Sequence, residues 1–84
     1  MRYLFYMPKK EFLREKDLAA LAKRFREQSG QTRAEAGREL GVSHVSIHRA
    51  EENSEISLLK LRLRMIEKYS SFKVVGPVFY LKRK

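Results

Sequence analysis

The stretch of sequence that decides the fold is residues 32–52, which read TRAEAGRELGVSHVSIHRAEE. Thr32 and Glu35 have the spacing of a capping box, in which each side chain accepts a hydrogen bond from the other residue's backbone at a helix start. Gly41 tolerates the positive φ at which many helices end, and Ser43 is a favoured residue for starting the next helix. The stretch therefore predicts two short helices on either side of a tight turn.

We expect these two helices at residues 33–40 and 44–52. The point where they cross needs a small residue, which Ala36-Gly37 provides. Four apolar side chains have the spacing that locks the second helix against the first: Leu40, Val42, Ile47 and Ala50. Two helices joined in this way form the helix-turn-helix pattern.

Longer helices flank the pair. Asp17 is the expected N-cap of a helix that runs to about Gln28 and ends at Ser29-Gly30. Its apolar stripe is Leu18, Leu21, Ala22 and Phe25. A fourth helix is expected over residues 55–69, with one apolar stripe made of Ile56, Leu59, Leu63 and Ile66 and a second made of Leu58, Leu61 and Met65. So wide an apolar surface exceeds what one small core needs, which indicates a partner.

Both ends of the chain are strand-like. Residues 2–7 are aromatic and β-prone up to Pro8. Residues 72–81 are also strand-like, with a bend or an edge strand expected at Pro77, which cannot donate to a ladder. We expect these ends to pair with each other or with a second chain. The expected organisation is one domain over residues 1–84: a strand or arm at 1–8, a helical core at 17–69, and a C-terminal strand with a basic tail at 72–84.

Composition limits the alternatives. The chain has 84 residues, a net charge of +9 and no Cys, so it is one small domain without disulfides, and a polyanion is its expected partner. Residues 31–53 carry three basic and four acidic side chains, so the excess positive charge lies on the two flanks. No apolar run is long enough to span a membrane, and the start is too short and too aromatic for a secretory signal. We expect a cytoplasmic protein, bacterial or phage-encoded and associated with the nucleoid.

From Phe25 to Glu51 the sequence resembles the Cro and phage-repressor type of helix-turn-helix, also called the Xre family. The shared features are Arg26-Glu27, a Gly, a Ser or Thr before a small-residue helix, Leu40-Gly41-Val42-Ser43, and the terminal Glu. With its flanking helices the resemblance covers roughly residues 17–69. It implies a mostly α fold of four to five helices, here with short terminal strands, and a DNA-binding regulator, specifically a repressor.

Three positions depart from the family pattern. Gln31 stands where an apolar residue is common, Arg33 where a Gln often contacts phosphate, and Gly37 where Ala is usual. Gly37 costs the helix about 1 kcal/mol of propensity relative to Ala. Arg33 is able to replace the usual phosphate contact.

In such folds the second helix of the pair lies in the major groove of double-stranded DNA. The residues expected to contact bases are Ser43, His44, Val45, His48 and Arg49, and those expected to contact phosphates are Thr32, Arg33 and Ser46. Arg49 suits guanine, the two His side chains suit purine acceptors, and Val45 suits a thymine methyl group. Protonation of His44 and His48 is expected to tighten binding as the pH falls from 8 to 6.

Simpler roles exist for several of these residues. Thr32 can act only as a cap, Arg49 can pair with Glu52, and Glu51 is expected to brace Arg26 or a helix end. His44 and His48 have a spacing that suits a metal, but no Cys supports one, so we expect neither metal nor cofactor. The tail, Lys82 to Lys84, is either solvated or in contact with phosphates. Four aromatic residues fit a β core better than a platform for single-stranded nucleic acid: Tyr3, Phe5, Phe79 and Tyr80.

A single reading helix contacts few base pairs, so a homodimer on two half-sites is expected. Its interface is placed on Leu58, Leu61, Met65, Val78 and Tyr80, although the first three fit the core equally well. The alternative function is the DNA-binding antitoxin, or interaction module, of a toxin–antitoxin pair, with the fourth helix or the strands holding a toxin. An enzyme is not expected, because no phosphate-binding Gly-rich loop, nucleophile–base pair or metal cluster is present.

Overall fold

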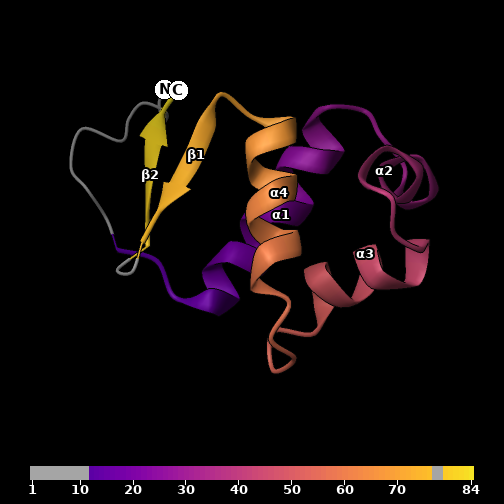
Figure 1. Cartoon of the computed structure of the whole chain (residues 1–84), viewed down its shortest axis with the longest axis horizontal. Helices are drawn as coiled ribbons and strands as arrows, with labels where there is room; N and C mark the ends of the chain where they lie inside the picture. Colours follow the sequence, from indigo (N-terminus) through magenta and orange to yellow (C-terminus); the bar gives the residue numbers. More distant parts are fainter. Residues whose placement is uncertain (1–11, 77–78) are drawn as a thin grey trace.

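The computed structural model describes residues 12–76 and 79–84, which form four helices and one hairpin in three zones along the longest axis (Figure 1). In the centre, α1 (Glu15–Gln28) packs against α4 (Leu59–Tyr69). At one end lie α2 (Arg33–Leu40) and α3 (His44–Glu52), which pack against each other. The opposite end is a hairpin described below. The mostly helical fold class predicted from the sequence is confirmed.

The core lies where the four helices meet. Leu18 and Ala22 from α1 face Met65 and Ile66 from α4, and all four side chains are fully buried. Ile47 brings α3 into the same core. The apolar spacing that predicted each helix is therefore also the surface that joins the helices, because residues three and four apart share one helix face.

The C-terminal strand-like segment folds on itself. Strands β1 (Phe72–Val75) and β2 (Tyr80–Arg83) pair antiparallel with Phe72 opposite Arg83. An isolated bridge, in which Leu13 N donates to Phe79 O at 2.7 Å, ties the hairpin to the chain just before α1. Pairing between the two ends of the chain was the expectation, but the partner of β1 is β2. The predicted strand at residues 2–7 and Val78 lie outside the described residues.

Two helix starts differ from their predictions. The N-cap of α1 is Arg14, and Asp17 is the third helical residue, whose Oδ2 accepts from Arg14 N at 2.8 Å. Helix α4 begins at Leu59 rather than at residue 55. Asn53 causes this delay: its Oδ1 accepts from Glu55 N at 3.2 Å and its carbonyl accepts from Ile56 N, so the chain makes a turn before it becomes helical.

The second apolar stripe of α4 is part of the core. Met65 is fully buried and Leu61 is 9% exposed, while Leu58 is partly buried against the core. A side chain buried within one chain has no surface to offer to another. The expectation that Leu61 and Met65 form a dimer interface is therefore wrong, because the approach of α1 and α3 to α4 already covers them.

Candidate nucleic-acid interface

The turn between α2 and α3 has the geometry that its sequence predicts. Thr32 Oγ1 accepts from Glu35 N at 3.1 Å, and Thr32 N donates to Glu35 Oε1 at 2.8 Å, so the capping box is complete. Gly41 ends α2 with φ +74°, in the left-handed region that favours glycine. Ser43 then caps α3, since its Oγ accepts from Ser46 N at 3.1 Å.

Gly37 is the contact point between α2 and the turn. A Cβ at this position would lie 2.7 Å from the carbonyl oxygen of Val42 and 3.2 Å from the backbone nitrogen of His44. Val42 N also donates to Gly37 O at 2.9 Å. The departure from the usual Ala is therefore matched by an unusually close approach of the backbone, and it sets the position of α3 relative to α2.

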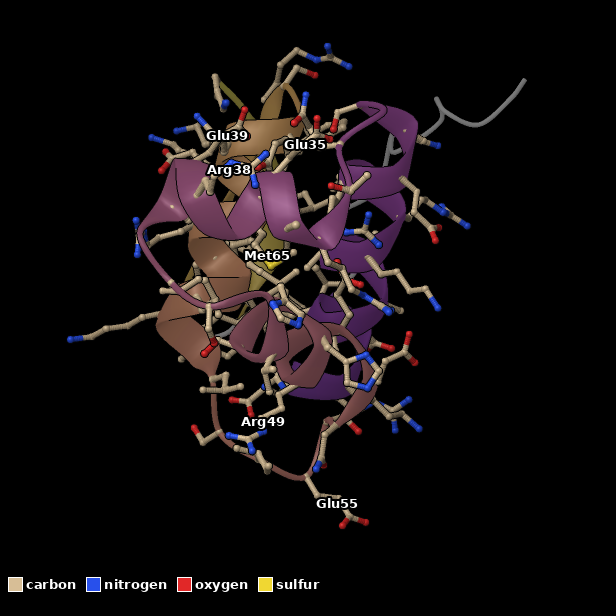
Figure 2. All side chains as sticks on the ribbon, turned by 90° about the vertical axis from the view of Figure 1, so that its right-hand side faces the viewer. Glu35, Arg38, Glu39, Arg49, Glu55 and Met65 are labelled. Atoms are coloured by element: carbon tan, nitrogen blue, oxygen red, sulfur yellow. The ribbon has the colours of Figure 1, made fainter. Side chains whose placement is uncertain are left out.

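Helix α3 has one buried and one exposed face. Ile47, Ala50 and Glu51 are buried, whereas all five of the predicted base-contacting residues are exposed: Ser43, His44, Val45, His48 and Arg49. Figure 2 looks onto this end of the molecule, with Arg49 low in the view on α3 and with Arg38 and Glu39 near the top, on α2. Within the described part of the chain, the Arg49 side chain has no hydrogen bond or ion pair, so it does not pair with Glu52.

Ser43 and Ser46 are occupied by local hydrogen bonds. Besides capping α3, the Ser43 hydroxyl lies 3.1 Å from the Ser46 hydroxyl. Either group retains capacity for one more partner, because a hydroxyl both donates and accepts. The exposed side chains between His44 and Arg49 thus supply the polar groups that are available to a partner at this surface. The two serines fix the start of the helix that carries those side chains.

The predicted phosphate ligand Arg33 faces acidic residues. Its Nε lies 2.9 Å from Glu51 Oε1 and one of its terminal nitrogens lies 2.8 Å from Glu52 Oε2. Glu51 also pairs with Arg26, whose Nε lies 2.5 Å from Glu51 Oε2. The Arg26 side chain is 8% exposed and the Glu51 side chain 0%. The expectation that Glu51 braces Arg26 is met, and the bracing extends to Arg33.

A second, more exposed ion pair extends this cluster. Lys23 Nζ lies 2.6 Å from Glu52 Oε2, with both side chains 38% exposed. The hydrogen bond from Lys23 is the main cause that lowers the pKa of Glu52, and the same bond raises the pKa of Lys23. The hydrogen bond to Glu51 similarly raises the pKa of Arg26, against the effect of burial.

Arg62 supports α3 from behind, a role that is not among the predictions from the sequence. Its side chain is fully buried, with Nε donating to Ala50 O and a terminal nitrogen to Asn53 O, both at 2.8 Å. The other terminal nitrogen pairs with Glu15 at 3.0 Å. A positive charge is favourable at the C-terminal end of a helix, where carbonyl groups lack partners. The signal was present in the sequence, because Arg62 lies one turn from Leu58 and Met65, inside an apolar stripe.

The basic tail is engaged at the far end of the molecule. Lys84 Nζ donates to the carbonyl groups of Glu67 and Ser70, which end α4. The Arg83 guanidinium lies over the Phe72 ring, 5.2 Å from its centroid. In Figure 1 the chain terminus lies at the end opposite α3, so the tail is remote from the surface that carries Arg49.

Two kinds of site are not found in the described residues. In residues 12–76 and 79–84, no group of three His, Asp or Glu side chains is placed to hold a metal ion. In the same part of the chain, no helix combines the length and the apolar character that crossing a bilayer requires.

Comparison with known proteins agrees with this geometry. Residues 17–57 match the family model of a helix-turn-helix domain, a span that contains α2, α3 and all of α1 except its first two residues. Neither the curated proteins nor the solved structures contain a match to the chain. Helix-turn-helix domains bind DNA through the second helix of the motif, which here is α3. Residues 17–57 therefore resemble a helix-turn-helix domain, consistent with the Cro and phage-repressor type, and this match supports a DNA-binding regulator in general terms.

Proposed function

We propose that this protein is a sequence-specific regulator that reads double-stranded DNA with α3 in the major groove. The observation that carries the proposal is the exposed face of α3, which displays two imidazoles, one aliphatic side chain and one arginine. Arg49 is placed to bind guanine O6 and N7, and His44 and His48 to donate to purine acceptors. Val45, which is 43% exposed, suits contact with a thymine methyl group.

Phosphate contacts flank this reading surface in the proposal. Thr32, Arg33 and Ser46 lie at the starts of α2 and α3, where backbone N–H groups and the helix dipole attract anions. The backbone N–H groups of Thr32 and Ser46 already donate within the caps, to Glu35 and Ser43, so their hydroxyl groups are the ones left to contact phosphates. Arg33 contributes fully only when its contacts with Glu51 and Glu52 loosen.

A homodimer on two half-sites is the form in which the protein acts. Both copies of α3 must face the same duplex, about 34 Å apart. The hairpin that contains Tyr80 lies at the opposite end from α3, so a dimer joined there would direct its two reading helices away from each other (Figure 1). We therefore place the contact beside α3, where Ile56 is 40% exposed in the connection to α4. The variant Ile56→Asp is expected to sediment as a monomer and to lose cooperative binding.

The direction of regulation is proposed as repression, in the cytoplasm, from the family resemblance. A bound homodimer that covers a promoter blocks it without any further activity. The antitoxin alternative placed a toxin on the fourth helix or on the terminal strands, and the burial of Leu61 and Met65 removes the support from the fourth helix. The proposal of repression thus rests on the family resemblance.

The experiment is selection of bound duplexes from a random pool, followed by affinity measurements with Arg49→Ala. Loss of a bidentate guanine contact costs about 1–3 kcal/mol of discrimination. We expect a loss of roughly 5- to 150-fold on the selected sequence and little change on a scrambled duplex, which serves as the control. Equal losses on the two duplexes, or no enriched sequence at all, would contradict the proposal.

A further inference from the structure

The carboxylate of Glu52 holds two cations at the edge of the reading surface. The same oxygen, Oε2, lies 2.6 Å from Lys23 Nζ and 2.8 Å from a terminal nitrogen of Arg33. Lys23 comes from α1 and Arg33 from the first turn of α2, so three helices meet at this one atom. All three side chains keep about a third of their surface exposed, which leaves the group open to a competing anion.

The position of Glu52 relates this group to the DNA. Glu52 follows His48 by four residues, so the two share one side of α3 and interact electrostatically. Lys23 and Arg33 therefore border the surface proposed to read bases. Glu52 is also the last residue of α3, where the helix dipole disfavours a carboxylate. The stability of α3 alone thus gives no reason for an acid at this position.

We propose that Glu52 restrains Lys23 and Arg33 from binding phosphates, which holds down the sequence-independent affinity of the domain for DNA. The proposal rests on the DNA-binding function proposed above and adds a residue that limits the sequence-independent part of the affinity. Counterion release at phosphates supplies essentially all non-specific binding, while base contacts supply specificity. A cation that is already paired in the free protein contributes less to non-specific binding, and it contributes nothing to specificity. Restraint of the two cations therefore lowers the affinity of the domain for any duplex, whatever its sequence.

The strength of the group fits a restraint rather than a permanent lock. An exposed ion pair contributes about 0–1 kcal/mol, so phosphate is able to compete for the two cations. Glu51 differs, because its side chain is fully buried beside Arg26 and keeps one contact with Arg33. Changing Glu52 thus releases charge at the surface and leaves the buried pair intact.

The test compares Glu52→Gln with Glu55→Gln. Each variant removes one negative charge, and Glu55 is an exposed residue at the same end of the molecule whose side chain has no ion pair in the described residues (Figure 2). Dissociation constants are measured over 50–300 mM salt on the selected duplex and on a scrambled one. We expect Glu52→Gln to bind the scrambled duplex roughly two- to fivefold more tightly, the range of an exposed ion pair, than Glu55→Gln does. Its slope of log K against log salt should steepen by about one unit, that of one additional phosphate contact.

A third variant identifies the released cation. Lys23→Gln is expected to change the salt slope little in the parent protein and to abolish the gain when combined with Glu52→Gln. Equal slopes for the Glu52 and Glu55 variants overturn the restraint, and weaker binding by Glu52→Gln overturns it in favour of a role in positioning α3. If the parent protein and every variant fail to bind duplex DNA, the proposed function fails instead.

Discussion

At the scale of single residues, the buried Arg62 connects the ends of three elements. Its guanidinium satisfies two carbonyl groups at the C-terminal end of α3 and pairs with Glu15 near the start of α1. Removal of one partner from a buried charged group leaves the other groups without hydrogen bonds, which costs about 3–5 kcal/mol. We expect Arg62→Met, which retains the side-chain volume, to lower the melting temperature by at least about 10 °C, since 1 kcal/mol corresponds to roughly 4–8 °C in a domain of this size.

Glu15→Gln is the matched control for that substitution. It breaks the ion pair with Arg62 but leaves the two carbonyl groups satisfied, and the Glu15 side chain is 31% exposed. The cost should stay below about 1 kcal/mol, as for other exposed pairs. If thermal unfolding shows the same loss for both variants, the carbonyl contacts of Arg62 do not stabilise α3.

Gly37 gives a prediction in which two effects oppose each other. Ala would favour the helix by about 1 kcal/mol, but its Cβ would lie 2.7 Å from the Val42 carbonyl oxygen, a backbone atom that moves only with the whole turn. Overpacking of this kind costs about 1–3 kcal/mol. We expect Gly37→Ala to destabilise the protein by about 1 kcal/mol in urea unfolding and to weaken DNA binding by displacing α3. A variant more stable than the parent would show that the turn accommodates the methyl group.

At the scale of elements, the capping box of α2 makes stability depend on pH. The hydrogen bond from Thr32 N, followed by that between the Thr32 side chain and Glu35, lowers the pKa of the Glu35 carboxyl in the folded protein. A lowered folded pKa means that this stabilisation is complete above the unfolded value of about 4.3 and is lost as the pH falls through the folded value. We expect Glu35→Gln to be less stable than the parent at pH 7 and the difference to shrink between about pH 5 and pH 3.

Urea midpoints at four pH values measure this dependence. Glu67→Gln is a suitable control, because Glu67 is exposed on α4 and its side chain has no hydrogen bond in the described residues. That variant should follow the pH dependence of the parent. A constant difference between Glu35→Gln and the parent over the whole range would contradict the assignment.

Helix starts were predicted correctly where a favoured N-cap residue occupies the cap position, as in α2 and α3, and missed where Arg14 or Leu58 does. The starts of α2 and α3 were predicted correctly from Thr32 and Ser43, because a cap involves only residues two or three positions away. The start of α4 was missed, since the apolar spacing of Ile56 fits a helix while the Asn53 turn delays it. Periodicity identifies which side chains are able to pack, but the neighbouring elements decide which of them do.

At the scale of the whole molecule, the separation of the two ends determines which charges act on DNA. The molecule is 35 Å long, with α3 at one end and the hairpin at the other (Figure 1). Lys82 is an exposed cation of β2. A duplex that lies against α3 does not reach it, so we expect Lys82→Gln to leave the salt slope of DNA binding unchanged. Arg49→Gln, at the opposite end, should weaken binding under the same conditions. A slope reduced by about one unit for Lys82→Gln would place the tail on a phosphate.

The sequence by itself determined the helix-turn-helix motif, because caps, a left-handed glycine and a small crossing residue are local requirements written within 21 consecutive positions. It also predicted which side chains of α3 face outward, since Ile47 and Ala50 fix its buried side. Only the tertiary structure decided what each charge does. Arg33 pairs with Glu51 and Glu52, and Arg62 is buried in the core. Lys84 donates to a carbonyl group at the C-terminal end of α4. Charge pairing depends on distances between residues far apart in the chain, and those distances exist only once the helices have packed.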